Sequence, residues 1–273
     1  DKAFKIITEA LALKRKLNDS LGIARSYKQI AQHLSYKKDY VSSINYFQKA
    51  LSIHRTLHSS YNIAVTLNSM GVVYTSAKQY KRGLTALQEA LSIVQSEGDS
   101  LFTEGIYLNI GFCYDGMGRL DSAEYYYLRS LTMSDMLNDR VSTPILLNNL
   151  GELYFQQNKL ALSETYLLRG LKAATVNNSL IDLRDIQNNL SELYARMNDF
   201  KKAYFYQEGF VRAADSLMNE EKMKALEELT VRFETKEIEE KNIILQKEND
   251  LQKSRLQQRN SSSLPSWYLP SYL

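Results

Sequence analysis

Apolar and small side chains recur along this chain with the spacing of one face of an α-helix, and the pattern repeats every 40 residues. One small residue of each repeat follows an apolar residue, and three positions later comes a leucine or tyrosine. Spacings of one, three and four residues bring side chains onto the same face of a helix. We therefore expect a helix around each of the five small residues Ala31, Gly71, Gly111, Gly151 and Ser191.

A second series of small residues predicts a second helix in each repeat, packed closely against the first. It consists of Ser43, Gly83, Ala123, Ser163 and Ala203. The segments between the helices are short and polar. LNDS at 17–20 is typical of those that follow a second helix, with Asn and Asp as the expected stop and Ser as the expected N-cap of the next helix. Pro144 is expected at a first helical position, where proline is tolerated.

A period of this length is typical of a repeat array, in which each unit builds its core with its neighbours. The chain resembles the tetratricopeptide repeat family, whose two-helix unit carries small residues at its eighth, twentieth and twenty-seventh positions and an aromatic residue at its eleventh. This resemblance implies an all-α, right-handed α-solenoid of about five full repeats after a partial N-terminal one, over residues 1–217. Each unit is 40 residues long, longer than the usual repeat of about 34.

The segment that follows the repeats is rich in Glu, Lys, Gln and Leu and has neither Gly nor Pro. We predict one long charged helix over 218–259 that either caps the solenoid or forms a coiled-coil stalk. Its seven-residue spacing of apolar side chains is short, and a homodimer through this helix is one hypothesis. Residues 260–273 carry two prolines and no periodicity, which indicates a tail without regular structure or a remnant of cloning.

Candidate chemistry is sparse. Lysine and arginine total 34 against 31 acidic residues and are scattered, so we expect no direct binding of nucleic acid. Cys113 is the single cysteine and is expected to be a packed, inert thiol. His54 and His58 are four residues apart, but without a third ligand we expect surface histidines and no metal site. No nucleophile and base pattern emerges, so we predict neither enzymatic activity nor a cofactor.

The face that the first helices turn inward carries a column of carboxamides. Carboxamides donate and accept hydrogen bonds, so this column can pair with the backbone of an extended peptide. A second interpretation is that some of these asparagines link adjacent helices or face water. The candidate binding residues are Lys28, Gln32, Asn68, Asn109, Asn148, Asn149, Glu152, Asn188, Asn189 and Glu192.

Two functions remain open at this stage. The repeats, the closing FKKAYFYQEGFVRAADSLMNEE and the helix after it resemble the sensory region of bacterial membrane regulators. That resemblance implies a peptide- or protein-binding input module on the periplasmic side, with a membrane span and a kinase or DNA-binding effector outside residues 1–273. The alternative is a soluble, cytoplasmic scaffold or adaptor. No run of about 18 apolar residues occurs within the chain itself.

Overall fold

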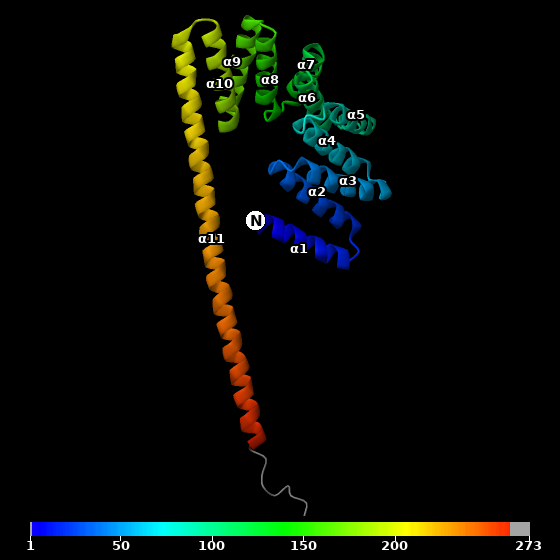
Figure 1. The fold of residues 1–273 in the computed structure, drawn as a ribbon, viewed down its shortest axis with the longest axis vertical. Coiled ribbons are helices and arrows are strands. Elements are labelled where there is room, and N and C mark those ends of the chain that lie inside the picture. The colour runs from blue at the N-terminus through cyan, green and yellow to red at the C-terminus, as the bar shows by residue number, and fades with distance from the viewer. Residues whose placement is uncertain (1, 263–273) are drawn as a thin grey trace, which may run out of the picture. The chain divides into compact units, whose positions relative to one another are not determined.

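The computed structural model of the protein describes residues 2–262 and consists there of helices. The expected all-α array of helix pairs followed by a long helix is confirmed (Figure 1). The helices are α1 (Lys2–Lys16), α2 (Ser20–Tyr36), α3 (Tyr40–Thr56), α4 (Ser60–Ser76), α5 (Tyr80–Glu97), α6 (Ser100–Gly116), α7 (Leu120–Leu137), α8 (Ser142–Gln156), α9 (Leu160–Val176), α10 (Leu180–Arg196) and α11 (Phe200–Ser262). The partial first unit is α1 alone.

The turns between helices are spaced every 20 residues. Each contains one residue with a left-handed backbone: Asn18, Lys38, His58, Lys78, Gly98, Gly118, Asn138, Asn158, Asn178 and Asn198. The residue after it donates its N–H to a carbonyl five positions back, as in Asp39 to Leu34 at 2.9 Å. This 6→1 bond satisfies a carbonyl at the end of the helix, while the same residue starts the next helix. The connections are therefore short and nearly identical, which keeps every helix pair in the same antiparallel arrangement.

The helix starts of the first and third units differ from the sequence expectation by one residue, whereas Ser179 caps α10 as expected. The N-cap is the aspartate before the serine in the first and third units: the Asp19 carboxylate accepts from Gly22 N at 2.8 Å, and Asp99 accepts from Phe102 N at 2.9 Å. An ionised carboxylate is a stronger hydrogen-bond acceptor than a serine hydroxyl. Its negative charge is also stabilised by the positive end of the helix dipole. Pro144 is the third residue of α8 rather than the first. It still lies among the first four residues, whose N–H groups have no partner within the helix.

The small residues allow the two helices of a unit to approach closely. A Cβ atom added to Gly111 would lie 2.5 Å from the Tyr127 ring, and one added to Gly151 would lie 2.5 Å from Leu167 Cγ. The Ser163 hydroxyl donates to the Gly151 carbonyl oxygen at 2.8 Å, so a small polar residue also serves in this contact. These contacts explain why both small series recur in register.

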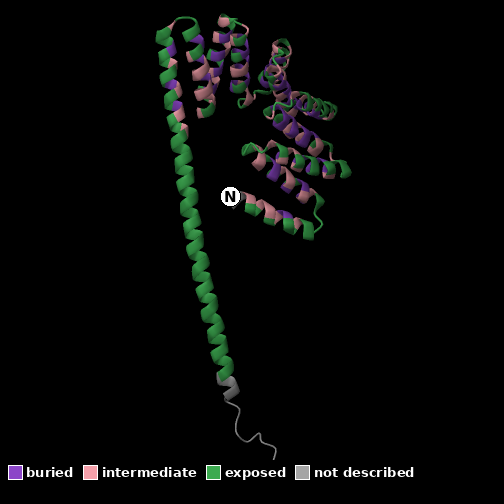
Figure 2. Cartoon of the chain, viewed as in Figure 1, coloured by how far each residue is buried: buried purple, intermediate pink, exposed green. Residues whose placement is uncertain are grey.

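The array is bent toward the side of its even-numbered helices. Among the described residues α4 contacts α6, α6 contacts α8 and α8 contacts α10, whereas α3, α5, α7 and α9 make no comparable contact with one another. Tighter packing on one side curves a stack of repeats and makes that side concave. Figure 2 shows that the buried residues are concentrated in the helices of this array.

The chain divides into two compact units, residues 1–214 and 215–273. The second includes most of α11, which is one continuous helix from Phe200 because no glycine or proline after Gly209 interrupts it. The predicted segment 218–259 lies inside this helix, which reaches Ser262; residues 263–273 of the predicted tail lie outside the described residues. From residue 218 to 258 all side chains are exposed (Figure 2). No helix within residues 2–262 combines the length and apolar content needed to cross a membrane.

Candidate concave binding site

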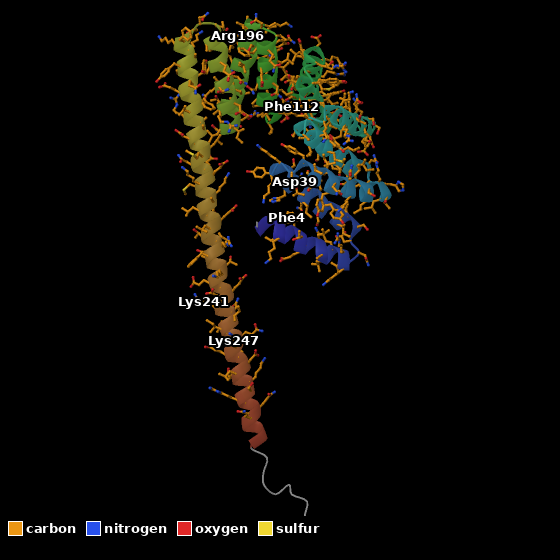
Figure 3. All side chains as sticks on the ribbon, viewed as in Figure 1. Phe4, Asp39, Phe112, Arg196, Lys241 and Lys247 are labelled. Carbon is orange, nitrogen blue, oxygen red and sulfur yellow. The ribbon has the colours of Figure 1, made fainter. Side chains whose placement is uncertain are left out.

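All ten candidate residues lie on the even-numbered helices. Two are on α2 and one each on α4 and α6, and three each are on α8 and α10. These helices line the concave side, so the candidates share one side of the array; Phe112 of α6, labelled in Figure 3, is also exposed. The side chains of this face are exposed or half-buried, and a ligand could reach them.

Four of the asparagines link neighbouring units. Asn109 Nδ2 donates to Asn68 Oδ1 at 2.9 Å, and Asn189 Nδ2 donates to Asn148 Oδ1, also at 2.9 Å. In both pairs the donor stands 41 residues after the acceptor. These bonds correspond to the second interpretation of the column, because they use carboxamides to join adjacent helices.

Asn149 differs from the other members of the column. The residue 41 positions before it is Leu108, which offers no hydrogen-bond acceptor on its side chain. Asn149 is half-buried and its carboxamide makes no hydrogen bond to another described residue. Asn188 is satisfied within its own helix, where its Nδ2 donates to Glu192 Oε1 at 2.9 Å. Gln32 likewise makes no hydrogen bond to another described residue, so the unused carboxamides are Gln32 at the α2 end and Asn149 near the middle of the array.

The two ends of this face carry opposite charges. Arg25 and Lys28 lie at the α2 end, where their positive charges lower the pKa of nearby His54 beyond the larger effect of burial. At the other end Glu152 is exposed, but partial loss of water around its carboxylate raises its pKa, and the negative charges of Asp115 and Glu192 add to this rise. The carboxylates thus form one negative region across α6, α8 and α10.

Exposed apolar side chains lie between these charged ends. Val72 on α4 is 39% exposed, Phe112 on α6 is 52% exposed, and Ile145 on α8 is 39% exposed. Val72 and Phe112 occupy the position held by Gln32 and Glu152 in other units. The concave face therefore changes from basic through apolar to acidic along the array.

The two histidines and the cysteine considered as reactive groups lie in surroundings that form no chemical site. The expectation of a surface His54 is wrong: its side chain is 2% exposed on α3, and its Nδ1 has no hydrogen-bond partner in the described part of the chain. His58 lies in the following turn with a left-handed backbone, so the two imidazoles do not share a helix face. Among residues 2–262 no cluster of three potential metal ligands occurs. Cys113 is fully buried, its thiol donates to the Tyr80 carbonyl at 3.2 Å, and burial raises its pKa.

Some residues of this face were missed because sequence reasoning followed the amides. Asp115 stands four positions after Gly111, on the same helix face, and that spacing could have identified it. Val72 and Phe112 could have been identified as an apolar part of the face, because they replace the polar Gln32 and Glu152 at the same repeat position.

The sequence matches a known family over part of its length. Residues 62–135 match the family model described as tetratricopeptide repeat. No curated protein matches the chain by sequence.

Several solved structures have a similar fold. The structure of BtubC from P. vanneervenii aligns with a TM-score of 0.68 at 17% identity, covering 79% of this chain and 91% of that chain. The Rap conjugation gene regulator of plasmid pLS20, in complex with the Phr* peptide, aligns with a TM-score of 0.65 at 22% identity over 74% of this chain. A signal transduction ATPase with a tetratricopeptide repeat sensor, from Pyrococcus horikoshii, aligns with a TM-score of 0.64 at 16% identity over 81% of this chain.

These likenesses concern the fold. The aligned part covers 56% of the Rap regulator and 35% of the ATPase. The similar structures share the repeat array, and the rest of each of those two proteins has no counterpart in the alignment.

Proposed function

We propose, from the premise that this chain is a tetratricopeptide-repeat protein, that its array binds an extended peptide segment of another protein along the concave face. The observation that carries this proposal is the sequence of surfaces along that face, basic at α2, apolar at α4 to α6 and acidic toward α10. The module has a binding role and no catalytic one.

The charge separation specifies the orientation of the peptide. An acidic end would lie near Arg25 and Lys28, and a basic end near Glu152 and Glu192, since complementary potentials orient a partner and exclude the reverse arrangement. Apolar side chains in the middle of the peptide would pack on Phe112, which is already half-exposed. The raised pKa of Glu152 would return toward its usual range when a cation binds beside it.

Asn149 supplies the hydrogen bonds to the peptide backbone. An extended peptide presents N–H and C=O groups along its edge, and a carboxamide can satisfy one of each. The Asn68–Asn109 and Asn148–Asn189 pairs fix the spacing of the helices that carry this residue. They contribute to the shape of the face rather than to direct recognition.

A selection from random peptides of about ten residues, roughly 33 Å when extended, tests this proposal on the whole chain. Enriched peptides are expected to carry acidic and basic residues at opposite ends. The double change Asn149→Ala with Glu152→Gln should weaken binding by at least about tenfold, the equivalent of roughly 1.4 kcal/mol. The matched control is Gln88→Ala on the outer helix α5, which should bind normally. Equal binding by the double variant, or enrichment without charge separation, would contradict the proposal.

A finer role is the input region of a bacterial signalling regulator. Two observations support it: α11 continues from the last repeat without a break, and the signal transduction ATPase is described as using a tetratricopeptide repeat as its sensor. In this role a bound peptide changes the stacking of the repeats and the helix passes the change on. Hydrogen exchange with and without a selected peptide tests it, with altered protection after residue 215 as the expected result. Protection changes confined to residues 1–214 would instead favour a scaffold.

The scaffold alternative is favoured by the apolar side chains of the long helix. Leu226, Leu229, Phe233, Ile244 and Leu251 are each more than half exposed. A homodimer through residues 218–258 would cover such side chains, and light scattering should then report twice the 31.4 kDa chain mass. Replacing Phe233 and Ile244 by Glu should yield monomers, while a wild-type chain that is monomeric at high concentration would exclude this dimer.

A further inference from the structure

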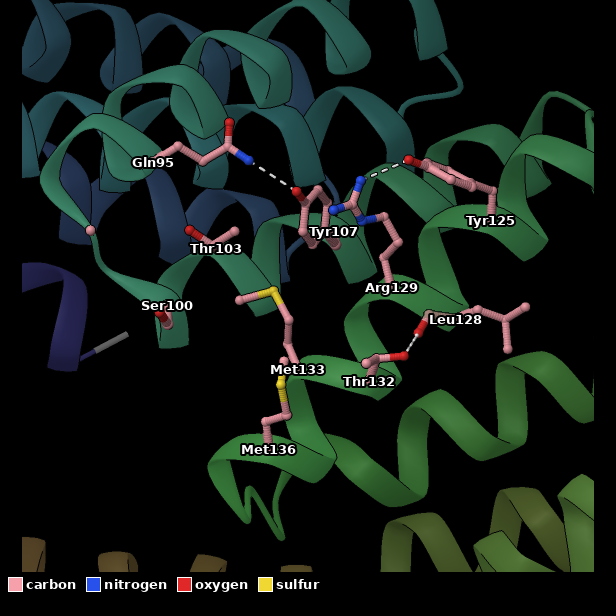
Figure 4. A pocket seen from close by; sticks show the side chains of 11 residues that line it. Gln95, Ser100, Thr103, Tyr107, Tyr125, Leu128, Arg129, Thr132, Met133 and Met136 are labelled. Carbon is pink, nitrogen blue, oxygen red and sulfur yellow. Dashed lines mark hydrogen bonds between the residues drawn. The ribbon is translucent and has the colours of Figure 1, made fainter.

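A pocket on the opposite side of the array from the even-helix face lies where the second repeat meets the third. The end of α5, the first half of α6 and the outer surface of α7 line an open pocket of about 570 Å³, a size typical of small-molecule sites (Figure 4). Its main side chains are Gln95, Tyr107, Tyr125, Arg129, Met133 and Met136.

Arg129 is held at this pocket by neutral groups. Its Nη1 donates to the Tyr125 hydroxyl at 2.7 Å, and its guanidinium carbon lies 5.3 Å from the Tyr107 ring centroid. Gln95 Nε2 donates to the Tyr107 hydroxyl at 2.9 Å and so fixes that ring. No carboxylate within residues 2–262 forms a salt bridge with Arg129. A guanidinium has five N–H donors, so most of those of Arg129 remain available.

The neighbouring junctions show what is missing here. Forty residues earlier, Arg55 and Glu89 occupy the places of Gln95 and Arg129, and they form an ion pair at 2.6 Å between the first and second repeats. Forty residues later, the same two places carry Asp135 and Arg169. Both flanking junctions thus include a carboxylate beside an arginine. The junction between α5 and α7 has the arginine without the carboxylate.

The side chains that line the pocket beside Arg129 suit the apolar part of a ligand. Figure 4 shows the Met133 and Met136 side chains together on one side of the pocket, next to the Tyr107 ring. Met136 is 70% exposed, although a thioether side chain is apolar. Methionine adapts its shape to a ligand and makes favourable contacts with aromatic rings. An anion bound here would therefore carry an aliphatic or aromatic group.

We propose that the pocket between α5, α6 and α7 binds a small organic acid, whose carboxylate pairs with Arg129 and whose apolar body packs on Met133 and Met136. A carboxylate accepts two parallel hydrogen bonds from the planar guanidinium, which fixes the orientation of the ligand. Such a carboxylate would lie opposite the arginine, as Asp135 does at the next junction, and would balance a charge that Glu89 balances for Arg55 at the previous one. The carboxylate could belong to a free acid or to the C-terminus of a peptide.

The test uses the whole chain with labelled methionine methyl groups, of which there are seven. The probes are 4-phenylbutyrate, its neutral amide, an acetylated Ala-Ala-Phe peptide with a free C-terminus, and the same peptide amidated. We expect the acids to shift the Met133 and Met136 signals saturably and the amides to leave them unchanged. A response to 4-phenylbutyrate alone identifies a free acid as the ligand, and a tighter response to the free peptide identifies a chain terminus.

Two variants and one control decide whether Arg129 is responsible. Arg129→Gln should weaken binding of the acid at least about tenfold. Gln95→Glu should do the same by supplying a carboxylate of the protein itself, since it recreates the charges of Asp135 and Arg169 in the next repeat. The control Arg169→Gln, at the same place in the next repeat, should bind normally. Amides that shift both methionines as strongly as the acids, or acids that shift neither, would overturn the proposal.

Asn149→Ala with Glu152→Gln should leave the methionine shifts unaltered, because those residues lie on α8 at the concave face. This keeps the pocket and the peptide site separable: either can fail while the other stands.

Discussion

Asn109 on α6 donates a hydrogen bond to Asn68 on α4 at 2.9 Å and so connects the third repeat to the second. The same bond joins Asn189 to Asn148 two repeats later. Between them, the junction that would pair Asn149 with residue 108 has a leucine and no bond. The inner helices are thus linked by polar contacts at alternate junctions.

A double-mutant cycle on Asn68 and Asn109 measures this link. Each single change to Ala should lower the free energy of unfolding by about 1 kcal/mol, and the double change should cost less than the sum, because one bond is lost in all three. Urea unfolding of the four proteins gives the coupling. Asn149→Ala serves as the control and should have little effect on stability; a loss as large as that of Asn109→Ala would show that Asn149 has a structural partner.

Two glycines of α6 should respond oppositely to the same substitution. Gly111→Ala places a Cβ 2.5 Å from the Tyr127 ring and should cost about 1 to 3 kcal/mol, since neither helix can move without disturbing its neighbours. Gly105→Ala meets nothing within 4 Å and should stabilise the protein by about 0.5 to 1 kcal/mol through its better helix propensity. Thermal unfolding distinguishes the two, and equal shifts in Tm would refute the close contact.

The start of α7 lacks a side-chain cap. Arg119 has the N-cap backbone, with φ −90° and ψ 69°, close to the −81° and 74° of Asp39, which does cap its helix. Arg119→Asp should raise the free energy of unfolding by about 0.5 to 2 kcal/mol, because the carboxylate can accept from an unpartnered N–H and favours the helix dipole. Arg119→Ala removes the positive charge without adding a hydrogen-bond acceptor, so it should raise the free energy of unfolding by less. If urea unfolding gives the same increase in the free energy of unfolding for both variants, the whole effect comes from removing the positive charge and none from capping.

Glu104 should make stability depend on pH. It is 1% exposed, burial raises its pKa above the ordinary 4.5, and the hydroxyl of Ser130 donates to its Oε1 at 2.9 Å. The folded state therefore favours the protonated carboxyl, and its contribution to stability is lost as pH rises from 4.5 through the raised pKa. Glu104→Gln should be more stable than the wild type at neutral pH and equal to it below the ordinary pKa. Denaturant unfolding across this range tests the sign, with the exposed Glu97→Gln as the control.

The repeat register was predictable because it depends on close packing, which only a few side chains allow. Gly71, Gly111 and Gly151 are small where the partner helix presents Leu87, Tyr127 or Leu167 at contact distance, so the sequence carries a strong, periodic signal. The length of α11 followed from helix propensity for a related reason: nothing after Gly209 interrupts it.

The binding surfaces were less predictable because they depend on which neighbour each side chain meets. The amides of Asn68 and Asn109 are alike in sequence to that of Asn149, yet the residue 41 positions away determines whether a bond forms. His54 was assigned to the surface because no third metal ligand accompanies it, although the outer helix turns it into the core. The missing carboxylate at Arg129 becomes visible only by comparing equivalent residues of neighbouring repeats, Arg55 with Gln95 and Glu89 with Arg129.

The 20-residue spacing of the turns also limits how the length of such a chain can change. Removal of residues 60–99 would join Ser59 to Ser100, which reproduces the junction of Asp99 with Ser100 and leaves every later helix in phase. Removal of only 20 residues would exchange inner with outer helices, and any other length would rotate all later faces by about 100° for each residue gained or lost. Growth and shortening of this molecule are thus confined to steps of one whole repeat.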